Sequence, residues 1–403
     1  MSPTSSTSST SDVGHRTSDF SASDFSALSA YFHIPFCETK CVYCDFYSIE
    51  DRSSQSKFVS LLKKEIALKI EEHPELLGRE LHTIFFGGGT PSLLSPEELS
   101  SIISEIKKNF IIARDVEFTL ECNPGTVTLE KLSGYRKLGV NRLSFGVQSF
   151  NADELQWLSR IHSADEARIA IKLAREAGFE NVSLDLMFAL PNQTKEKLSY
   201  SLDEALALGT DHISAYNLTV EEGTPLNRMV KLGQVGEMAQ EEAAELFEMV
   251  QTRLAEAGYS QYEISNYAKS PATRAHHNLV YWDGFKEYVS FGPSAHEFLG
   301  GMRAWNVSSL EQYGAMIEGG KLPRINSEEL PIENRKTEVL FCQLRATGIA
   351  LRQFKKIFGE DLLRHAELPM LLHEGMVVVE GDYLKLTKKG YRFCDGVVIR
   401  LMK

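Results

Sequence analysis

Three of the six cysteines in this chain lie within eight residues, in the stretch HIPFCETKCVYCDFYS that begins at His33. The spacing of Cys37, Cys41 and Cys44 is irregular for a helix face, but it suits a loop wrapped around a compact inorganic centre. Thiolates are the usual ligands of iron–sulfur clusters, and three cysteines on a four-iron cube leave one iron open. An open coordination position is typical of a reactive metal site. The loop therefore predicts a reactive iron–sulfur centre.

Two other interpretations of these cysteines remain open at this point. One is a zinc site with His33 or a distant group as fourth ligand, and the other is a set of three unligated thiols. Structural zinc sites usually pair two CxxC-like motifs, and no second motif follows. Cys122, Cys342 and Cys394 stand alone in the sequence, and we predict that they are small core residues.

The elements that must position this loop are short apolar strands that alternate with amphipathic helices. We predict strands at 28–35, 81–87, 116–122, 142–148, 182–188 and 212–219. We predict helices at 56–72, 96–110, 128–139, 151–178, 194–209 and 237–257, and a further helical run at 351–373. Six successive β/α units imply a parallel sheet with crossover helices, either an incomplete barrel or a doubly wound sheet.

Both folds place their ligands at the carboxyl ends of the strands. The cysteine loop follows the first predicted strand, and the stretch 87–91 follows the second. Glu121 ends the third strand, Gln148 ends the fourth, and Asp185 lies late in the fifth. We therefore expect these groups to meet at one rim of the sheet.

Five segments of this sequence resemble a known family. The segments YFHIPFCETKCVYCDF (31–46), GGGTP (87–91), ECNPG (121–125), SFGVQSFN (144–151) and DLMFALPNQT (185–194) resemble the radical S-adenosylmethionine (SAM) enzymes. Within that family they are similar to the oxygen-independent coproporphyrinogen III oxidase group. The resemblance extends from about residue 29 into the C-terminal part of the chain.

The resemblance implies the fold and the site residues. The expected fold is α/β, an incomplete (β/α)6 radical SAM barrel with a small C-terminal winged-helix-like α+β module. The resemblance implies a [4Fe–4S] cluster on Cys37, Cys41 and Cys44, with SAM on the open iron. It also implies that the following residues contact the cluster or SAM: Tyr31, Tyr43, Gly87, Gly88, Gly89, Thr90, Glu121, Gln148, Arg160, Asp185 and Ala215. Such contacts suit a nucleoside that needs acceptors for its diol, a partner for its carboxylate and close backbone approach.

Two positions depart from the oxidase pattern. Phe46 stands where true oxidases of the group carry a further cysteine, which favours the related haem chaperones of the HemW type. Ala189 stands where the family commonly has glycine, and a methyl group there would narrow the pocket.

A second segment, HNLVYW from His277 to Trp282, resembles the HNxxYW motif attributed to haem binding in that branch. If the segment is helical, His277 and Tyr281 share a face, and the resemblance implies that His277, Tyr281 and Trp282 bind haem. A histidine beside aromatic residues is also typical of ordinary packing. His276 and His296 are further candidates for the haem ligand.

Composition and charge limit the remaining possibilities. A net charge of −12 argues against a general nucleic-acid binder, and no apolar run is long enough to span a membrane. No secretory signal is recognisable, so we expect a cytoplasmic protein. The predicted divisions are a flexible Ser/Thr-rich tail at 1–28, a radical SAM partial barrel at 29–220, a barrel-completing extension at 221–325 and the winged-helix-like module at 326–403. We expect the module, with its hairpin at Gly381 and Asp382, to pack over the open side of the sheet, with nucleic-acid contact as the alternative.

These observations lead to three functional hypotheses. The first is a haem chaperone that binds a [4Fe–4S] cluster, SAM and haem, delivers haem to apo-haemoproteins, and takes electrons from a donor such as a flavodoxin or ferredoxin. The alternative is an oxygen-independent coproporphyrinogen III oxidase, which removes carbon dioxide from two propionate side chains. The third is a zinc-dependent interaction protein.

Overall fold

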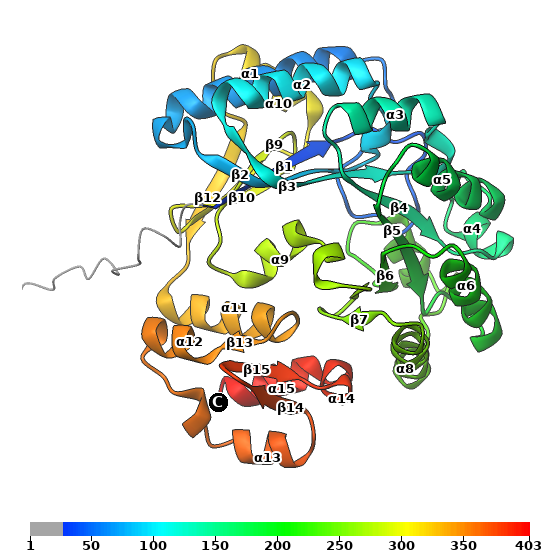
Figure 1. Cartoon of the computed structure of the whole chain (residues 1–403), viewed down its shortest axis with the longest axis vertical. Coiled ribbons are helices and arrows are strands. Elements are labelled where there is room, and N and C mark those ends of the chain that lie inside the picture. Colours follow the sequence, from blue (N-terminus) through cyan, green and yellow to red (C-terminus); the bar gives the residue numbers. More distant parts are fainter. Residues whose placement is uncertain (1–26) are drawn as a thin grey trace, which may run out of the picture.

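The computed structural model describes residues 27–403, and a single open sheet of twelve strands forms its centre (Figure 1). The strand order is β12-β11-β10-β9-β1-β2-β3-β4-β5-β6-β8-β7. The six strands predicted from the sequence are β1 to β6, and each is parallel to the next. The predicted incomplete barrel is therefore confirmed. The tail predicted at 1–28 lies outside the described residues, except for its last two positions.

The bounds of the elements follow the sequence closely in the first half of the chain. The strands of the large sheet are β1 (Leu28–Ile34), β2 (Glu80–Gly88), β3 (Ile111–Cys122), β4 (Arg142–Gln148), β5 (Asn181–Phe188), β6 (His212–Asn217), β7 (Ser260–Gln261), β8 (Asn266–Ala268), β9 (Tyr288–Phe291), β10 (His296–Leu299), β11 (Met302–Asn306) and β12 (Arg324–Glu329). The helices before the C-terminal module are α1 (Gln55–Glu72), α2 (Pro96–Asn109), α3 (Leu129–Lys137), α4 (Ala152–Trp157), α5 (Ala164–Glu176), α6 (Lys195–Ala207), α7 (Pro225–Lys231), α8 (Gln240–Glu256), α9 (His276–Asp283) and α10 (Leu310–Glu318).

Apolar side chains fill the space between the parallel strands and the outer helices. Phe32 of β1 stacks on Phe86 of β2 with ring centroids 4.7 Å apart, and Phe86 stacks on Phe118 of β3 at 5.6 Å. Capping boxes at Ser95 and Ser163 fix the first turns of α2 and α5. Burial of this outer face stabilises the strands and so fixes where their carboxyl ends lie.

The inner face of the same strands is polar, because side chains alternate between the two faces of a strand. On β4, Phe145 and Val147 belong to the apolar core, whereas Ser144 donates a hydrogen bond to Asp185 of β5 at 3.3 Å. The helix α9 lies on this inner side, next to β2 (Figure 1). A polar inner face enclosed by a helix is suited to hold a polar ligand.

Two of the predicted helices are interrupted. The run 151–178 forms α4 and α5 with a break between them, where Ser159 has a left-handed φ of 59°. The helical run predicted at 351–373 also divides, because Gly359 ends the first helix in a left-handed conformation with φ 75°. The helical spacing of apolar residues continues across both breaks, so the sequence pattern did not predict where the helices end.

The segment 221–325, predicted as a barrel-completing extension, contains short strands that the sequence did not indicate. It supplies β7 to β11, and β9 adds a further parallel strand on the free edge of β1. These strands have two to five residues, too few for a recognisable alternation. The divisions predicted at 29–220, 221–325 and 326–403 remain predictions.

The C-terminal module has its own core and its own three-stranded sheet, ordered β13-β15-β14. Its elements are α11 (Ile332–Leu344), β13 (Ile349–Ala350), α12 (Leu351–Phe358), α13 (Leu368–His373), β14 (Val377–Glu380), β15 (Tyr383–Leu386), α14 (Lys388–Arg392) and α15 (Cys394–Leu401). The expected hairpin is present between β14 and β15. Gln343 of α11 donates a hydrogen bond to the carbonyl of Asp283 in α9 at 2.8 Å, and Arg392 pairs with Glu248 of α8. The module therefore packs against the inner side of the molecule (Figure 1).

Candidate metal and cofactor site

The cysteine loop begins at the carboxyl end of β1 and is closed at its base by backbone hydrogen bonds. Cys37 N donates to the carbonyl of Ile49 at 2.9 Å, and Ile49 N donates to the carbonyl of Pro35 at 2.7 Å. Cys37 and Cys41 are buried, Cys44 is half-buried, and all three are free thiols. The closed base holds the three cysteines together in one loop at the rim of the sheet.

Two polar groups from other elements face these sulfur atoms. The hydroxyl of Thr90 donates to Cys37 Sγ at 3.5 Å, and Arg160 Nη1 donates to Cys41 Sγ at 3.3 Å. Burial raises the pKa of the Cys37 thiol and raises the pKa of Cys44 to about 11. A cation and a hydroxyl donor beside the sulfurs stabilise the thiolate form, which is the form that binds iron. The donor set therefore fits a thiolate-held cluster, with Tyr43 packed beside it.

His33 is one of the candidates for the fourth ligand of a zinc site, and both of its ring nitrogens are already hydrogen-bonded. The hydroxyl of Tyr31 lies 3.1 Å from Nδ1, and Nε2 lies 2.8 Å from the carbonyl of Tyr47. The carbonyl requires a proton on Nε2, so Nδ1 accepts from Tyr31. Burial lowers the pKa of His33 to about 4. Within residues 27–403, no three His, Cys, Asp or Glu side chains are arranged around a single metal ion.

The glycine run after β2 lies directly against the cysteine loop. Gly89 N donates to the carbonyl of Ile34 at 2.8 Å, and Thr90 N donates to the carbonyl of Phe36 at 2.7 Å. A Cβ on Gly89 would lie 2.6 Å from the carbonyl of Phe36, and one on Gly88 would lie 2.5 Å from the ring of His33. Only glycine allows the two backbones to approach this closely.

Glu121, at the end of β3, reaches toward the same place. Its Oε2 accepts a hydrogen bond from Gly88 N at 3.2 Å. Burial, and then the nearby carboxylate of Asp185, raise the pKa of Glu121 to about 8. Burial also raises the pKa of Asp185. Two carboxyl groups held in this way favour a ligand that brings hydroxyl donors and positive charge, which a sulfonium nucleoside has.

Arg160 and Gln148 connect the end of β4 to the cysteine loop. Arg160 Nη2 donates to the carbonyl of Gly146 at 2.6 Å while its other terminal nitrogen faces Cys41. Gln148 has a left-handed φ of 72°, and its buried Oε1 accepts no hydrogen bond from any described residue. A buried acceptor without a donor is suited to a ligand that supplies one.

Ala215 and Ala189 are placed differently from the other predicted contacts. Ala215 belongs to the core on the helix side of β6, whereas its neighbour Ser214 faces Asp185. A contact between Ala215 and adenine would therefore involve its backbone. Ala189 has a left-handed φ of 59°, which explains why glycine is common at this position in the family.

Several polar residues of the inner face were not predicted from the sequence. Arg142 is buried on β4, and its Nε has no partner among the described residues. Its positive charge partly offsets the rise that burial causes in the pKa of Glu121 and of Asp185. Ser144 and Ser214 face Asp185 from the two neighbouring strands. The sequence feature that could have identified them is the alternation of polar and apolar residues along these strands, which is clear in β4.

The HNLVYW segment is helical and forms most of α9, so the condition for His277 and Tyr281 to share a face is met. His277 is fully buried, and its Nδ1 lies 2.7 Å from the hydroxyl of Thr83 while its Nε2 lies 2.8 Å from the hydroxyl of Tyr281. Trp282 is directed to the carboxylate of Glu263. Tyr281 lines a cavity of about 400 Å³. Haem binding by these three residues stays a prediction.

The chain is similar to known proteins over most of its length. Residues 31–205 match the radical SAM superfamily. The heme chaperone HemW of Bacillus subtilis (strain 168) is 38% identical over 368 residues, which are 90% of this chain and 96% of that protein. The heme chaperone HemW of Escherichia coli (strain K12) is 33% identical, over 92% of this chain and 97% of that protein. A solved structure with a similar fold is that of coproporphyrinogen III oxidase (HemN) from Escherichia coli, a radical SAM enzyme. The two structures superpose with a TM-score of 0.80 at 23% sequence identity, over 94% of this chain and 91% of that one. This similarity shows a shared fold.

Proposed function

From the premise that this chain belongs to the radical SAM superfamily and, within it, to the family of the heme chaperone HemW, we propose that it is a haem chaperone. It binds a [4Fe–4S] cluster, SAM and haem, and it delivers haem to apo-haemoproteins. The observation that carries this proposal is the rim at which the cysteine loop meets Gly88, Glu121 and Arg160.

Each part of the rim has a role in this proposal. Cys37, Cys41 and Cys44 hold the cluster, and Arg160 compensates the charge of the thiolates and binds the carboxylate of SAM. Glu121 accepts hydrogen bonds from the ribose hydroxyls, and the backbone of Gly87–Thr90 contacts the methionine portion. When bound, the cluster supplies an electron to the sulfonium. Tyr31, Gln148 and Asp185 add polar contacts around the ligand.

The cellular context belongs to the same proposal. Of the helices in the described part of the chain, none has the length and apolar composition that a bilayer crossing requires. We place the protein in the cytoplasm, where thiols stay reduced. The electron donor in this proposal is a flavodoxin or a ferredoxin. The negative net charge of −12 does not favour nucleic acid as a partner.

The test compares haem binding with oxidase turnover in one preparation. Protein reconstituted with iron and sulfide under anaerobic conditions is titrated with haem, and the same protein is incubated with SAM, reductant and coproporphyrinogen III. We expect saturable haem binding near one equivalent and no formation of protoporphyrinogen. Turnover without haem binding would replace the proposal with the oxidase, and material without iron or acid-labile sulfide would remove the cluster from it.

A further inference from the structure

Arg142 is a buried cation on the inner face of the sheet to which the contacts proposed for the cluster and SAM give no role. The residue is 2% exposed, and its Nε has no partner among the described residues. No hydrogen bond or ion pair joins the rest of its guanidinium to another residue of the range 27–403. Burial of a charged group is unfavourable unless an opposite charge compensates it. The position therefore needs an explanation.

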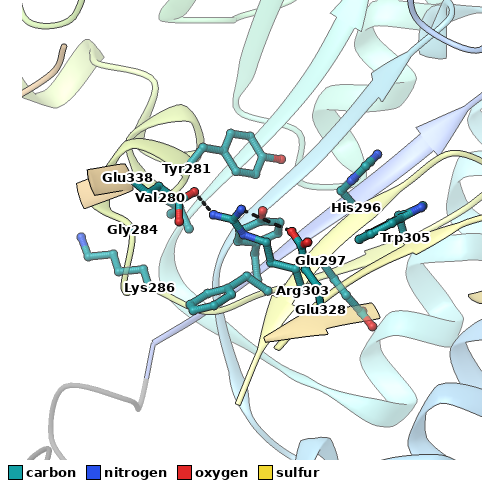
Figure 2. Close-up of a pocket in the computed structure, with 12 residues that line it drawn as sticks. Val280, Tyr281, Gly284, Lys286, His296, Glu297, Arg303, Trp305, Glu328 and Glu338 are labelled. Atoms are coloured by element: carbon teal, nitrogen blue, oxygen red, sulfur yellow. Dashed lines mark ion pairs between the residues drawn. The ribbon is translucent and has the colours of Figure 1, made fainter. Parts of the chain in front are cut away.

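Two other arginines show the usual arrangement, in which direct contacts hold the guanidinium. Arg303, in the cavity beside α9, forms ion pairs with Glu328 and Glu338, which the dashed lines in Figure 2 mark. Arg160 donates a hydrogen bond to the carbonyl of Gly146 at 2.6 Å. Arg142 has no contact of either kind.

The residues beside Arg142 on the two adjacent strands carry no charge. In the register of the sheet, Arg142 lies opposite Thr119 of β3 and Asn181 of β5. The hydroxyl oxygen of Thr119 and Oδ1 of Asn181 are buried and have no partner among the described residues, so neither accepts from the guanidinium. Neighbours at this position of the sheet therefore do not compensate the charge of Arg142.

Two carboxyl groups lie further toward the carboxyl ends of the same two adjacent strands. Ser144, two residues after Arg142 on β4, lies opposite Glu121 in the register and donates a hydrogen bond to Asp185 at 3.3 Å. Residues two apart on a strand point to the same face. Arg142, Glu121 and Asp185 therefore face one interior space, and the guanidinium opposes the rise that burial causes in the pKa of both carboxyl groups.

The other groups around this space are neutral or have partners of their own. Arg160 is a second cation near Asp185, but its nitrogens already face the cysteine loop and the end of β4. Glu117 accepts hydrogen bonds from two amides of α9, and Glu263 accepts one from the amide of Ser265 at 3.2 Å. Burial lowers the pKa of the histidines and raises the pKa of the tyrosines on the surrounding elements, so these rings are neutral at pH 7: Tyr31, His33, His212, Tyr216, Tyr262, His277 and Tyr281.

The charges in this space balance when the proposed ligand is included. Glu121 and Asp185 carry two negative charges when both are ionised. Arg142 supplies one positive charge, and the sulfonium of SAM supplies the other. Without Arg142 the sulfonium alone would face the two carboxyl groups, and one of them would keep a proton, because like charges this close disfavour joint ionisation. A protonated carboxyl group is a weaker acceptor for the ribose hydroxyls than a carboxylate.

We propose that Arg142 is a positioning residue for SAM, which keeps Glu121 and Asp185 ionised together and so sets the lowest pH at which SAM binds tightly. This inference rests on the proposed function and assigns a role to a residue that does not contact the ligand. Even with Arg142 present, burial and the charge of Asp185 raise the pKa of Glu121 to about 8. The site therefore works close to the limit of its pH range, and loss of the guanidinium would move that limit upward.

The test measures the affinity of cluster-loaded, full-length protein for SAM by anaerobic equilibrium dialysis between about pH 6 and about pH 9.5. In wild type we expect affinity to rise with pH and to level off above the pKa of Glu121. In Arg142→Gln this rise should shift upward by about one pH unit, so that affinity falls about tenfold at neutral pH and approaches wild type at the highest pH. Arg142→Lys keeps the charge and should restore most of the wild-type profile. The amino group of SAM titrates in the same way with every variant, so it cancels in the comparison.

Two further variants separate this role from a structural one. Arg114→Gln removes an exposed positive charge from β3 and should leave the profile unchanged. Arg142→Gln combined with Asp185→Asn removes one charge of each sign. The midpoint of its profile should return toward wild type, although the double variant binds SAM more weakly at every pH. Iron and sulfide content, measured in each variant, should match wild type.

Two results would overturn the proposal. One is an equal loss of SAM affinity at every pH in Arg142→Gln, which would indicate a direct contact or a structural defect, and the other is a profile that does not move. Should Arg142→Gln not take up the cluster, Asp185→Asn with and without Arg142→Gln gives the same comparison, and the midpoint should be higher in the double variant. Failure of wild-type protein to bind SAM at any pH is a different result, because it removes SAM from the proposed function itself.

Discussion

At the scale of single residues, burial decides which groups of the inner side are available for chemistry. His33 and His277 lie at the centre of the molecule with both ring nitrogens hydrogen-bonded. His296 belongs to the same side of the sheet but keeps its ring free. The type of a residue alone therefore does not show whether its imidazole is enclosed or accessible.

Burial of His277 predicts a pH dependence of stability. The folded chain protonates this ring only near pH 3, because burial lowers its pKa, whereas the unfolded chain protonates it near the ordinary value of 6.5. Between pH 6.5 and pH 3 the unfolded state therefore binds one more proton at this ring than the folded state does. As the pH falls through this range, the folded state loses up to about 1.4 kcal/mol of stability per pH unit for each such histidine.

The variant His277→Gln tests this dependence, since it removes one titrating ring. We expect the free energy of unfolding to fall less steeply between pH 6.5 and 5.5 than in wild type, by roughly one proton. Anaerobic urea unfolding of cluster-loaded protein gives the slope, and His82→Gln on β2 controls for the loss of an imidazole. Equal slopes in wild type and His277→Gln would contradict the burial argument.

At the scale of elements, the N-terminus of α9 is fixed by a carboxylate from the sheet. Glu117 of β3 accepts hydrogen bonds from His276 N and His277 N, both at 2.9 Å. These amides are among those that a helix leaves without internal partners, and a negative charge at this end is favourable. At the other end Gly284 stops the helix in a left-handed conformation against Val339 of the module.

Replacement of this carboxylate should loosen α9. In Glu117→Gln one acceptor oxygen becomes a donor facing a backbone amide, so we expect about 1–3 kcal/mol of destabilisation. Hydrogen exchange of the α9 amides should accelerate, and haem affinity should fall because Tyr281 moves with the helix. Asp115→Asn, an exposed change on the same strand, is the matched control. Unchanged exchange in α9 would show that other contacts hold it.

At the scale of the whole molecule, the two proposed ligand regions depend on different parts of the chain. The rim proposed for the cluster and SAM is built from residues between Tyr31 and Asp185, whereas the HNLVYW segment proposed to bind haem lies on α9. The module contacts α9 through Gln343. Cluster binding and haem binding should therefore be separable.

Truncation after Pro331 removes the module and should abolish haem binding while iron, sulfide and SAM binding stay near wild type. Gln343→Ala is the milder variant for the case that the truncated chain does not fold. It leaves the carbonyl of Asp283 without this donor, so we expect a loss of about 1–2 kcal/mol in stability and a several-fold loss of haem affinity. Loss of the cluster in Gln343→Ala would show that the two regions are not independent.

The sequence by itself determined the parallel core and the position of the cysteine loop. Apolar strands between amphipathic helices predicted β1 to β6, since periodicity is a local property of the chain. The spacing of Cys37, Cys41 and Cys44 lies within one loop, and the strand-end rule brought Glu121 and Asp185 to the same rim without knowledge of any contact.

Tertiary structure alone decided how the two histidines of the inner side differ. His277 is enclosed by Thr83, nearly two hundred positions away in sequence, and His296 is held in place through Glu65 and its contact with Gly292. The short strands β9 to β12 likewise become strands by pairing along an edge that β1 provides. The physical reason is that burial and hydrogen bonding depend on distant partners, which neither the type of a residue nor its local spacing specifies.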